Sequence, residues 1–301
     1  MRLLHIDTGQ EMRGGQGQVL LLLEVLREAG HECILLTRRN SPLQKEAARL
    51  NITWHDASIP NIWSLSRGVD LVHVHDAHAH TLSAIAAQAP FVVSRRVAFP
   101  VRASMASRWK YSRAVRFLAV SRFVADQLYA AGIPREKVDV VYDAVRQPRY
   151  LNEWSADAPA VALDSDDPLK CRDVIKSACL EATLDCTFSN DLERDFQHAS
   201  MFLYISRSEG LGSAVLLAMS MGVPVITNRV GGLNEVIEQE VSGIFTDGSA
   251  EGVAGAMMTI AGNPQLAHRL ISGGRQRVAE RFTTRHLLAG TLCSYTRALG
   301  H

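Results

Sequence analysis

The sequence predicts an α/β protein with two domains, each built on a parallel sheet with helices on both faces. The chain of 301 residues is about twice the length of a typical domain. Short apolar runs alternate with segments of helical periodicity in both halves, as expected for βαβ units. A polar stretch at 146–159 carries two prolines and no clear period, which predicts a linker between the two domains. We therefore expect two Rossmann-like, doubly wound domains, residues 1–150 and 151–285, whose strand-end loops face a shared cleft.

In the first half, apolar runs predict six strands and helical periodicity predicts three helices. Gly30 and Gly132 follow the last periodic residue of a helix, where glycine is a usual stop signal, and Ser121 is an N-cap residue. The expected strands are Leu3–Asp7, Glu32–Thr37, Val69–His75, Pro90–Ser94, Val115–Val120 and Val138–Tyr142, and the expected helices are Gln18–Ala29, Thr81–Gln88 and Arg122–Ala131.

The second half repeats the alternation. The expected strands are Ala160–Leu163, Asp185–Phe188, Phe202–Ser206 and Pro224–Asn228, and the expected helices are Arg172–Ala182, Ser213–Met221, Gly252–Ala261 and Pro264–Arg281. The last helical stretch, within residues 286–301, has no place in this second sheet. It could therefore cross back to the first domain.

Charge and cysteine content exclude several classes of protein. The formal net charge is +1, which argues against a strongly basic nucleic-acid binder, and we expect no nucleic-acid partner. Residues 1–150 carry 20 Lys and Arg against 13 Asp and Glu, net +7, whereas the remainder carries 12 against 18, net −6. The five cysteines include no C-x-x-C pair, which argues against a zinc site and fits a reducing compartment. We expect no signal peptide and a cytoplasmic protein, with peripheral contact to the membrane left open.

The most informative local motif is Ser208-Glu209-Gly210-Leu211-Gly212-Ser213. It follows an expected strand and opens an expected helix. The two glycines let a ligand approach the backbone, and the free N–H groups of a helix start favour an anion. Glu209 could accept hydrogen bonds from sugar hydroxyls. On these six residues alone, a simple strand–helix turn is about as good an interpretation.

The residues that follow make the pattern specific. Residues 218–228 read A-M-S-M-G-V-P-V-I-T-N, and residues 231–237 read G-G-L-N-E-V-I. With 208–213 they resemble the C-terminal signature of the retaining nucleotide-sugar glycosyltransferases of family 4, which have the GT-B fold. The family pattern is roughly S-E-G-F-G-x-x-x-L-E-A-M-A-x-G-x-P-V-I-x-x-x-x-G-G-x-x-E-V.

The first half resembles the same family. Arg13-Gly14-Gly15-Gln16 is similar to its first strand–helix loop, and residues 70–76 (D-L-V-H-V-H-D) are similar to its H-x-H strand. Residues 119–121 (A-V-S), followed by G-I-P at 132–134, match a later segment. The resemblance covers nearly the whole chain. It implies a transfer that retains the anomeric configuration, in glycan, glycolipid or polysaccharide biosynthesis.

The resemblance also implies roles for residues. Glu209 would orient the transferred sugar, and Gly15, Lys170 and the amides of 210–213 would bind the leaving diphosphate. His78 and Arg96 complete the expected catalytic group. The full set expected to bind the donor is Gly14, Gly15, Lys170, Gly210, Leu211, Gly212, Ser213, Arg229 and Glu235. Enzymes of this kind need no divalent metal for chemistry, so we expect no cofactor.

Three positions depart from the family. Leu217 stands where the family has a second Glu that binds the ribose, and Leu163 stands where it has an Arg that binds phosphate. Losing both groups would weaken donor binding by a factor of about 100. Arg95-Arg96 replaces a histidine that many members carry after the Pro90–Ser94 strand. Arg95, Arg96 or Arg229 could compensate at the phosphates.

Four alternating histidines, His73, His75, His78 and His80, raise the possibility of a metal site. Alternate residues of a strand share one face. No cysteine or carboxylate cluster accompanies them, so buried or cleft-lining histidines are the better interpretation.

Residues 95–116 contain seven basic and no acidic residues, interleaved with Phe99, Met105, Trp109 and Tyr111. They could contact a membrane or a lipid-linked acceptor, or they could form an ordinary solvated basic face.

The sequence thus favours a glycosyltransferase that moves a sugar from a nucleoside diphosphate sugar to a hydroxyl acceptor. This acceptor could be linked to a lipid. The departures favour one alternative, a degenerate GT-B protein that binds nucleotide or glycan or supports an active partner. A sugar-nucleotide epimerase or a phosphorylase is a weaker hypothesis. A dinucleotide-dependent dehydrogenase is disfavoured because Gly14–Gly17 does not give G-x-G-x-x-G.

Overall fold

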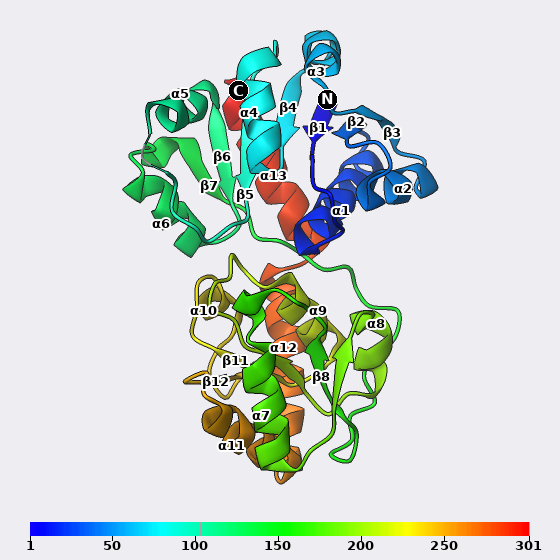
Figure 1. The fold of residues 1–301 in the computed structure, drawn as a ribbon. Helices are drawn as coiled ribbons and strands as arrows, with labels where there is room; N and C mark the ends of the chain where they lie inside the picture. The colour runs from blue at the N-terminus through cyan, green and yellow to red at the C-terminus, as the bar shows by residue number, and fades with distance from the viewer. Residues whose placement is uncertain (103, 301) are drawn as a thin grey trace. The chain divides into compact units, whose positions relative to one another are not determined.

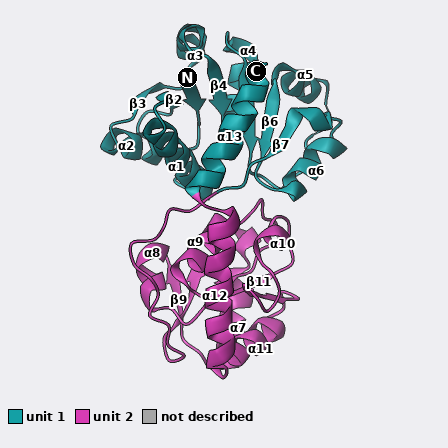
Figure 2. Ribbon diagram, turned by 180° about the vertical axis from the view of Figure 1, so that it is seen from behind, with its two compact units in different colours: residues 1–143, 284–301 teal, residues 144–283 magenta. Residues whose placement is uncertain are grey.

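The computed structural model describes residues 1–102 and 104–300. It separates into two compact units, residues 1–143 together with the chain from Thr284 onward, and residues 144–283 (Figure 2). These boundaries differ from the expected 150/151 and 285/286. The polar stretch 146–159 is part of unit 2 rather than a linker, because Asn152 N–H donates to Met221 O at 2.8 Å and Trp154 Nε1 donates to Ser200 O at 2.8 Å.

Unit 1 is a parallel sheet with the strand order β3-β2-β1-β4-β5-β6-β7, seven strands within the described residues (Figure 1). Its elements are β1 Arg2–Ile6, α1 Gly14–Glu28, β2 Glu32–Thr37, α2 Pro42–Arg49, β3 Thr53–Asp56, α3 Ile59–Leu65, β4 Leu71–Val74, α4 Ala77–Ala86, β5 Phe91–Arg95, α5 Met105–Arg113, β6 Arg116–Ala119, α6 Arg122–Ala130, β7 Val138–Val140 and α13 Thr284–Leu299. The C-terminal helix α13 lies beside α1 and packs on β5, β6 and β7.

Unit 2 is a parallel sheet with the order β12-β11-β10-β8-β9, five strands within the described residues. Its elements are β8 Ala160–Leu163, α7 Arg172–Ala182, β9 Cys186–Ser189, α8 Leu192–Asp195, β10 Phe202–Tyr204, α9 Ser213–Met221, β11 Val225–Asn228, α10 Leu233–Val236, β12 Ile244–Thr246, α11 Ala250–Ala261 and α12 Pro264–Arg281, with a short 3₁₀ turn at Pro168–Lys170. Its core of aliphatic side chains lies where α7, α11 and α12 cover the sheet.

Each sheet has a point where the chain reverses the direction in which strands are added. In unit 1 this point lies between β1 and β4, and in unit 2 it lies between β8 and β10. Ligands of open parallel sheets bind outside the carboxyl ends of the strands at such a point. The fold therefore predicts ligand-binding residues in the loops that follow these four strands.

The structure corrects several expected elements. Helix α1 begins at Gly14, four residues before the expected start, so Gly14 and Gly15 lie in its first turn. Helix α4 begins at Ala77, four residues before the expected start at Thr81, and the Asp76 side chain caps it by accepting hydrogen bonds from the N–H groups of His78 and Ala79. Strands β3 and β12 and helices α3, α5, α8 and α10 are not among the expected elements, because they are short and partly exposed.

The described helices include none that is both long and apolar enough to cross a bilayer.

Candidate functional site

A carboxylate, an ammonium and a phenol meet at the reversal point of the unit 2 sheet. Lys170 follows β8, Tyr204 ends β10, and Glu209 lies in the loop after β10. Lys170 Nζ donates to Glu209 Oε2 at 2.7 Å and to the Tyr204 hydroxyl at 2.6 Å. The Tyr204 hydroxyl in turn donates to Glu209 Oε2 at 2.5 Å. The structure thus brings together two expected site residues, Glu209 and Lys170.

The Glu209 carboxylate is held at both oxygens. Oε1 accepts from the N–H of Gly210 at 3.1 Å, while Lys170 and Tyr204 hold Oε2. The side chains of Lys170 and Glu209 are 20% and 15% exposed, so a ligand can reach them. Tyr204 is buried, and this burial together with the neighbouring Glu209 charge raises the Tyr204 pKa well above its usual value. Tyr204 therefore stays protonated and remains a hydrogen-bond donor.

Two glycines let a second loop pack directly on the Glu209 loop. A Cβ at Gly231 would lie 1.9 Å from the carbonyl oxygen of Glu209, and one at Gly232 would lie 2.1 Å from the carbonyl oxygen of Gly210. Gly231 also has a φ of +51°. The N–H of Gly232 donates to Glu209 O at 3.2 Å. The glycine pair of the sequence motif thus fixes the backbone that carries Glu209.

Helix α9 begins at this loop. Its N-cap residue, Gly212, has a φ of +103° and provides no side-chain cap. The first turn contains no acidic residue. Amide groups of a helix start without such a cap attract an anion. The Gly210 N–H already donates to Glu209 Oε1, so the amides of residues 211–213 are the better candidates for binding phosphate or sugar oxygens.

The other expected residues of unit 2 lie at the margins of this cluster. Arg229 is exposed, with its guanidinium 4.2 Å from the centre of the Phe245 ring, and Glu235 lies on the short helix α10. Leu217 is half-buried on α9, one helical turn after Ser213, and Leu163 ends β8. Neither leucine can accept a hydroxyl hydrogen bond or bind a phosphate.

Arg96 of unit 1 lies against the start of α1. A Cβ on Gly15 would lie 3.9 Å from Arg96 Cδ. Arg96 Nε donates to Asp143 Oδ1 at 3.1 Å, and its Nη1 donates to His75 Nδ1 at 3.3 Å. The structure thus brings together two expected site residues, Gly15 and Arg96. Gly14, the first residue of α1, is exposed.

Arg95 has a different environment from Arg96. Its Nη1 donates to the Tyr111 hydroxyl at 2.9 Å, and its Nη2 donates to the carbonyl oxygen of Phe99. Arg95 therefore anchors α5 and the loop before it. This finding argues against the hypothesis that Arg95 compensates at the phosphates and leaves Arg96 as the better candidate of the two.

The histidines fall into two environments. His78 is exposed in the first turn of α4, whereas His73, His75 and His80 are buried. Burial, reinforced by nearby positive charge, lowers the pKa of His80 to about 3 and the pKa values of His73 and His75 well below their usual value. These three imidazoles are therefore neutral at physiological pH.

His5 joins His73 and His75 in a buried group of three that could in principle hold a metal. Ring nitrogens of His5, His73 and His75 lie within 4.8 Å of one another. Hydrogen bonds already occupy every ring nitrogen of the three except His5 Nε2. His73 contacts the Tyr295 hydroxyl at 2.6 Å and Ser94 Oγ at 2.7 Å, and His5 Nδ1 contacts His75 Nε2 at 3.0 Å. A cation there would also face the Arg96 charge. The arrangement fits a hydrogen-bonded network better than a metal centre.

Sequence reasoning missed Tyr204, His5 and Asp143. No short motif contains them, and strand order rather than local spacing brings His5 and Asp143 to their partners. Tyr204 is a polar residue at the end of a buried apolar strand, directly before the loop motif. A phenol at such a place requires a partner, and this signal could have identified it.

Two family models match the chain and between them extend through both units. Glycosyltransferase Family 4 matches residues 12–146, and Glycosyl transferases group 1 matches residues 167–277. The chain belongs to the family 4 glycosyltransferases. The matched segments contain both the Gly15–Arg96 contact and the Lys170–Tyr204–Glu209 cluster.

Curated relatives of this family 4 glycosyltransferase are similar over part of the chain. The D-inositol 3-phosphate glycosyltransferase of Saccharomonospora viridis is 32% identical over 110 residues, which are 36% of this chain and 25% of the relative. The N-acetyl-alpha-D-glucosaminyl L-malate synthase of Bacillus anthracis is 30% identical over 92 residues, 30% of this chain and 24% of the relative. The match thus spans about a quarter of the length of these relatives.

Solved structures are similar over the whole chain. The Anabaena protein HepE, solved with UDP and glucose, has a TM-score of 0.84 at 16% identity and covers 98% of this chain and 100% of its own. A glycosyltransferase from Rickettsia africae has a TM-score of 0.82 at 18% identity, with 99% and 98% covered. This family 4 glycosyltransferase therefore has the expected α/β GT-B fold.

Proposed function

We propose that this protein transfers a sugar from a nucleoside diphosphate sugar to a hydroxyl acceptor, with retention of the anomeric configuration. The observation that carries the proposal is the Lys170–Tyr204–Glu209 cluster at the reversal point of the unit 2 sheet. A carboxylate fixed at both oxygens can orient sugar hydroxyls, and an adjacent ammonium can bind a phosphate. HepE, which shares the fold, was solved with UDP-glucose, which supports a donor of this class.

The chemistry assigned to the residues follows from their charges. Lys170 and the amides of 211–213 would stabilise the charge that develops on the leaving diphosphate, because preorganised donors act most strongly on developing charge. In unit 1, the first turn of α1 and the Arg96 guanidinium would also bind phosphate oxygens. Glu209 would hold the sugar ring. No step in this scheme needs a divalent metal. We place the reaction in glycan, glycolipid or polysaccharide biosynthesis in the cytoplasm.

A panel of UDP-, GDP- and ADP-sugars tests this proposal directly. Purified protein incubated with each donor, with and without simple hydroxyl acceptors, should release the nucleoside diphosphate from one of them. A coupled assay for the released diphosphate measures the reaction, and NMR of the sugar product reports the anomeric configuration. An inverted product would contradict the retaining mechanism.

Leu217 favours a second candidate function. The alkyl side chain on α9 leaves the expected ribose acceptor absent, so the protein could be a degenerate GT-B protein that binds a nucleotide or glycan without transferring sugar. Calorimetry with the same panel separates the two functions. Binding of a nucleoside diphosphate without turnover of any donor would favour the degenerate protein. If neither binding nor turnover is seen with any donor, sugar transfer and nucleotide binding are both contradicted.

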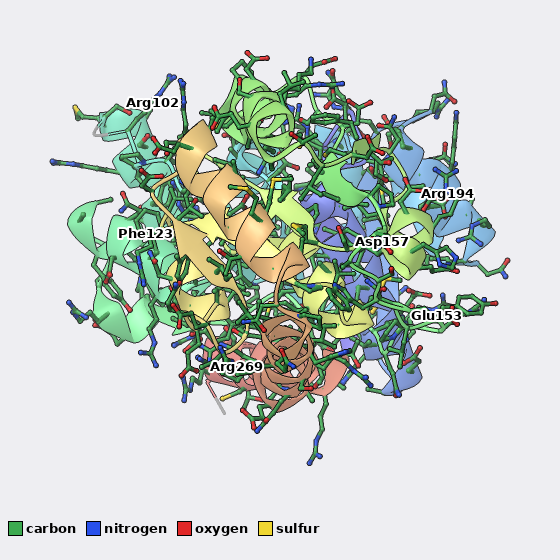
Figure 3. All side chains as sticks on the ribbon, turned by 90° about the horizontal axis from the view of Figure 1, so that it is seen from below. Arg102, Phe123, Glu153, Asp157, Arg194 and Arg269 are labelled. Atoms are coloured by element: carbon green, nitrogen blue, oxygen red, sulfur yellow. The ribbon has the colours of Figure 1, made fainter. Side chains whose placement is uncertain are left out.

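We also propose that residues 95–116 contact an anionic membrane or a lipid-linked acceptor. Within this segment Met105, Phe99 and Trp109 are 88%, 54% and 49% exposed. Arg108 and Arg113 of α5 are exposed as well, and Arg102 lies at the rim of unit 1 in Figure 3. Exposed apolar side chains surrounded by basic residues are typical of a surface that binds anionic lipid.

Cosedimentation with vesicles tests this contact. Vesicles containing anionic lipid should bind the protein, and neutral vesicles should not. The double variant Arg108→Glu/Arg113→Glu should lose about tenfold or more in binding, since each basic residue near the surface contributes about 1 kcal/mol. The control Lys137→Glu changes a basic residue elsewhere in unit 1 and should bind nearly as the wild type. Equal binding by both variants would contradict the proposed surface.

A further inference from the structure

Arg96 is held more firmly than a residue on a loop usually is. Its side chain is 14% exposed and that of its partner Asp143 is 10% exposed. Two of its donor groups are taken, Nε by Asp143 and Nη1 by His75. A planar guanidinium held at two of its nitrogens has a fixed plane and direction. The chain thus supports this arginine with two buried side chains from other parts of unit 1.

The register of the sheet places the supporting histidines. His5 on β1 pairs directly with His73 on β4, so the side chain of His75, two residues further along, follows on the same face. His75 is nearly fully buried, and its Nε2 lies 3.0 Å from His5 Nδ1. Asp143 lies three residues after β7. The group therefore depends on strand order.

Arg96 determines where the protons of this network lie. A guanidinium has only donors, so His75 Nδ1 must accept and carries no proton. A neutral His75 therefore carries its proton on Nε2 and donates it to His5 Nδ1. His5 then carries its own proton on Nε2, an atom that is buried without a hydrogen-bond partner among the described residues. The hydrogen bonds run in one direction, from Arg96 to His5.

Burial and the Arg96 charge keep both imidazoles neutral, with the pKa of His5 lowered to about 3 and that of His75 lowered well below its usual value. A protonated His75 would lose the lone pair that Arg96 requires. The neutral state is therefore consistent with the direction of the hydrogen bonds.

We propose that His75 and Asp143 are positioning residues that hold the Arg96 guanidinium beside the first turn of α1, with His5 accepting the Nε2 proton of His75 from behind. This inference rests on the proposed function, in which Arg96 binds the diphosphate of the donor. The remaining N–H groups of Arg96 would bind the phosphate oxygens. In this scheme Asp143 and His75 act on the donor only through the arginine.

A second ion pair in unit 1 provides a matched control. Arg116 Nε donates to Asp139 Oδ2 at 2.8 Å, and the two side chains are 14% and 11% exposed, almost the same as in the Arg96–Asp143 pair. Asp139→Asn therefore removes a charge with the same burial and in the same unit, but without contact to Arg96. A merely structural role for Asp143 predicts the same effects from Asp143→Asn and Asp139→Asn.

Calorimetric titration with UDP, GDP and ADP in turn measures the effect. With the nucleotide that the wild type binds best, Arg96→Ala should weaken affinity by about 10- to 100-fold, the loss of a charge-assisted contact. Asp143→Asn and His75→Gln should weaken it by about 3- to 10-fold, and Asp139→Asn by less than about twofold. Thermal unfolding of each variant shows whether it is folded.

Two outcomes overturn the proposal. Unchanged affinity in Arg96→Ala shows that this residue does not bind the diphosphate, and equal affinity in Asp143→Asn and Asp139→Asn shows that Asp143 does not position it. If the wild type binds none of the three nucleotides, it is the proposed function that fails. Two-bond ¹⁵N–¹H spectra of the imidazole rings then test the hydrogen-bond network without a ligand. His5 and His75 should both be protonated at Nε2, and protonation of His75 at Nδ1 would contradict the proposed network.

Discussion

Glu209→Ala is expected to remove donor turnover, with a loss of at least about 100-fold in kcat/KM. The carboxylate is fixed at both oxygens by Lys170, Tyr204 and the Gly210 amide, so its position is set before any ligand arrives. Preorganised polar groups of this kind contribute more than flexible ones. The substitution also leaves the Lys170 ammonium without its carboxylate partner. The measurement is release of diphosphate from the preferred donor.

Two further variants separate charge from shape at this position. Glu209→Gln keeps the shape and removes the charge, and it should retain little activity if the carboxylate accepts sugar hydroxyls. Tyr204→Phe keeps the buried ring and removes one hydroxyl, and it should lower kcat/KM by about 3- to 10-fold. Tyr111→Phe removes a comparably buried hydroxyl in unit 1 and serves as the control, with activity close to that of the wild type. Full activity in Glu209→Ala would refute the assigned role.

Gly231→Ala is expected both to destabilise unit 2 and to lower donor turnover. The new Cβ would lie 1.9 Å from the carbonyl oxygen of Glu209, and the φ of +51° is unfavourable for alanine. The left-handed conformation costs about 1–2 kcal/mol, and overpacking typically adds about 1–3 kcal/mol. The backbone of the Glu209 loop must move to relieve the contact. The midpoint of urea unfolding should fall, and donor turnover should fall with it.

Gly255→Ala is the matched control for this substitution. Gly255 lies inside α11 in the same unit, and a Cβ there meets nothing within 4 Å. Alanine at such a helix position should stabilise the protein by about 0.5–1 kcal/mol and leave turnover unchanged. A Gly231→Ala variant that unfolds at the wild-type midpoint would show that the two loops are not packed as described.

The sequence predicted the fold class and part of the candidate site. Alternating strands and helices predicted the two parallel sheets, and the loop motif at 208–213 placed Glu209 and the start of α9 correctly. Helix α1 was predicted to start four residues too late, since glycines at 14, 15 and 17 obscure the period. Short elements such as β3 and α5 were missed for a related reason, since a few partly exposed residues carry little periodic signal.

The amino-acid sequence by itself determined the fold class and the motif loops. These features depend on neighbours a few positions away along the chain, as in the first residues of a helix, the glycines of a tight loop and the apolar period of a strand. Contacts between distant residues depend on which strands are adjacent and in what register. The hydrogen bonds of Lys170 with Tyr204 and Glu209 exist because β8 and β10 are neighbours. The network from Arg96 through His75 to His5 exists because β4 lies between β1 and β5. Only the tertiary structure decided these partners, because strand order brings together residues that no local spacing relates.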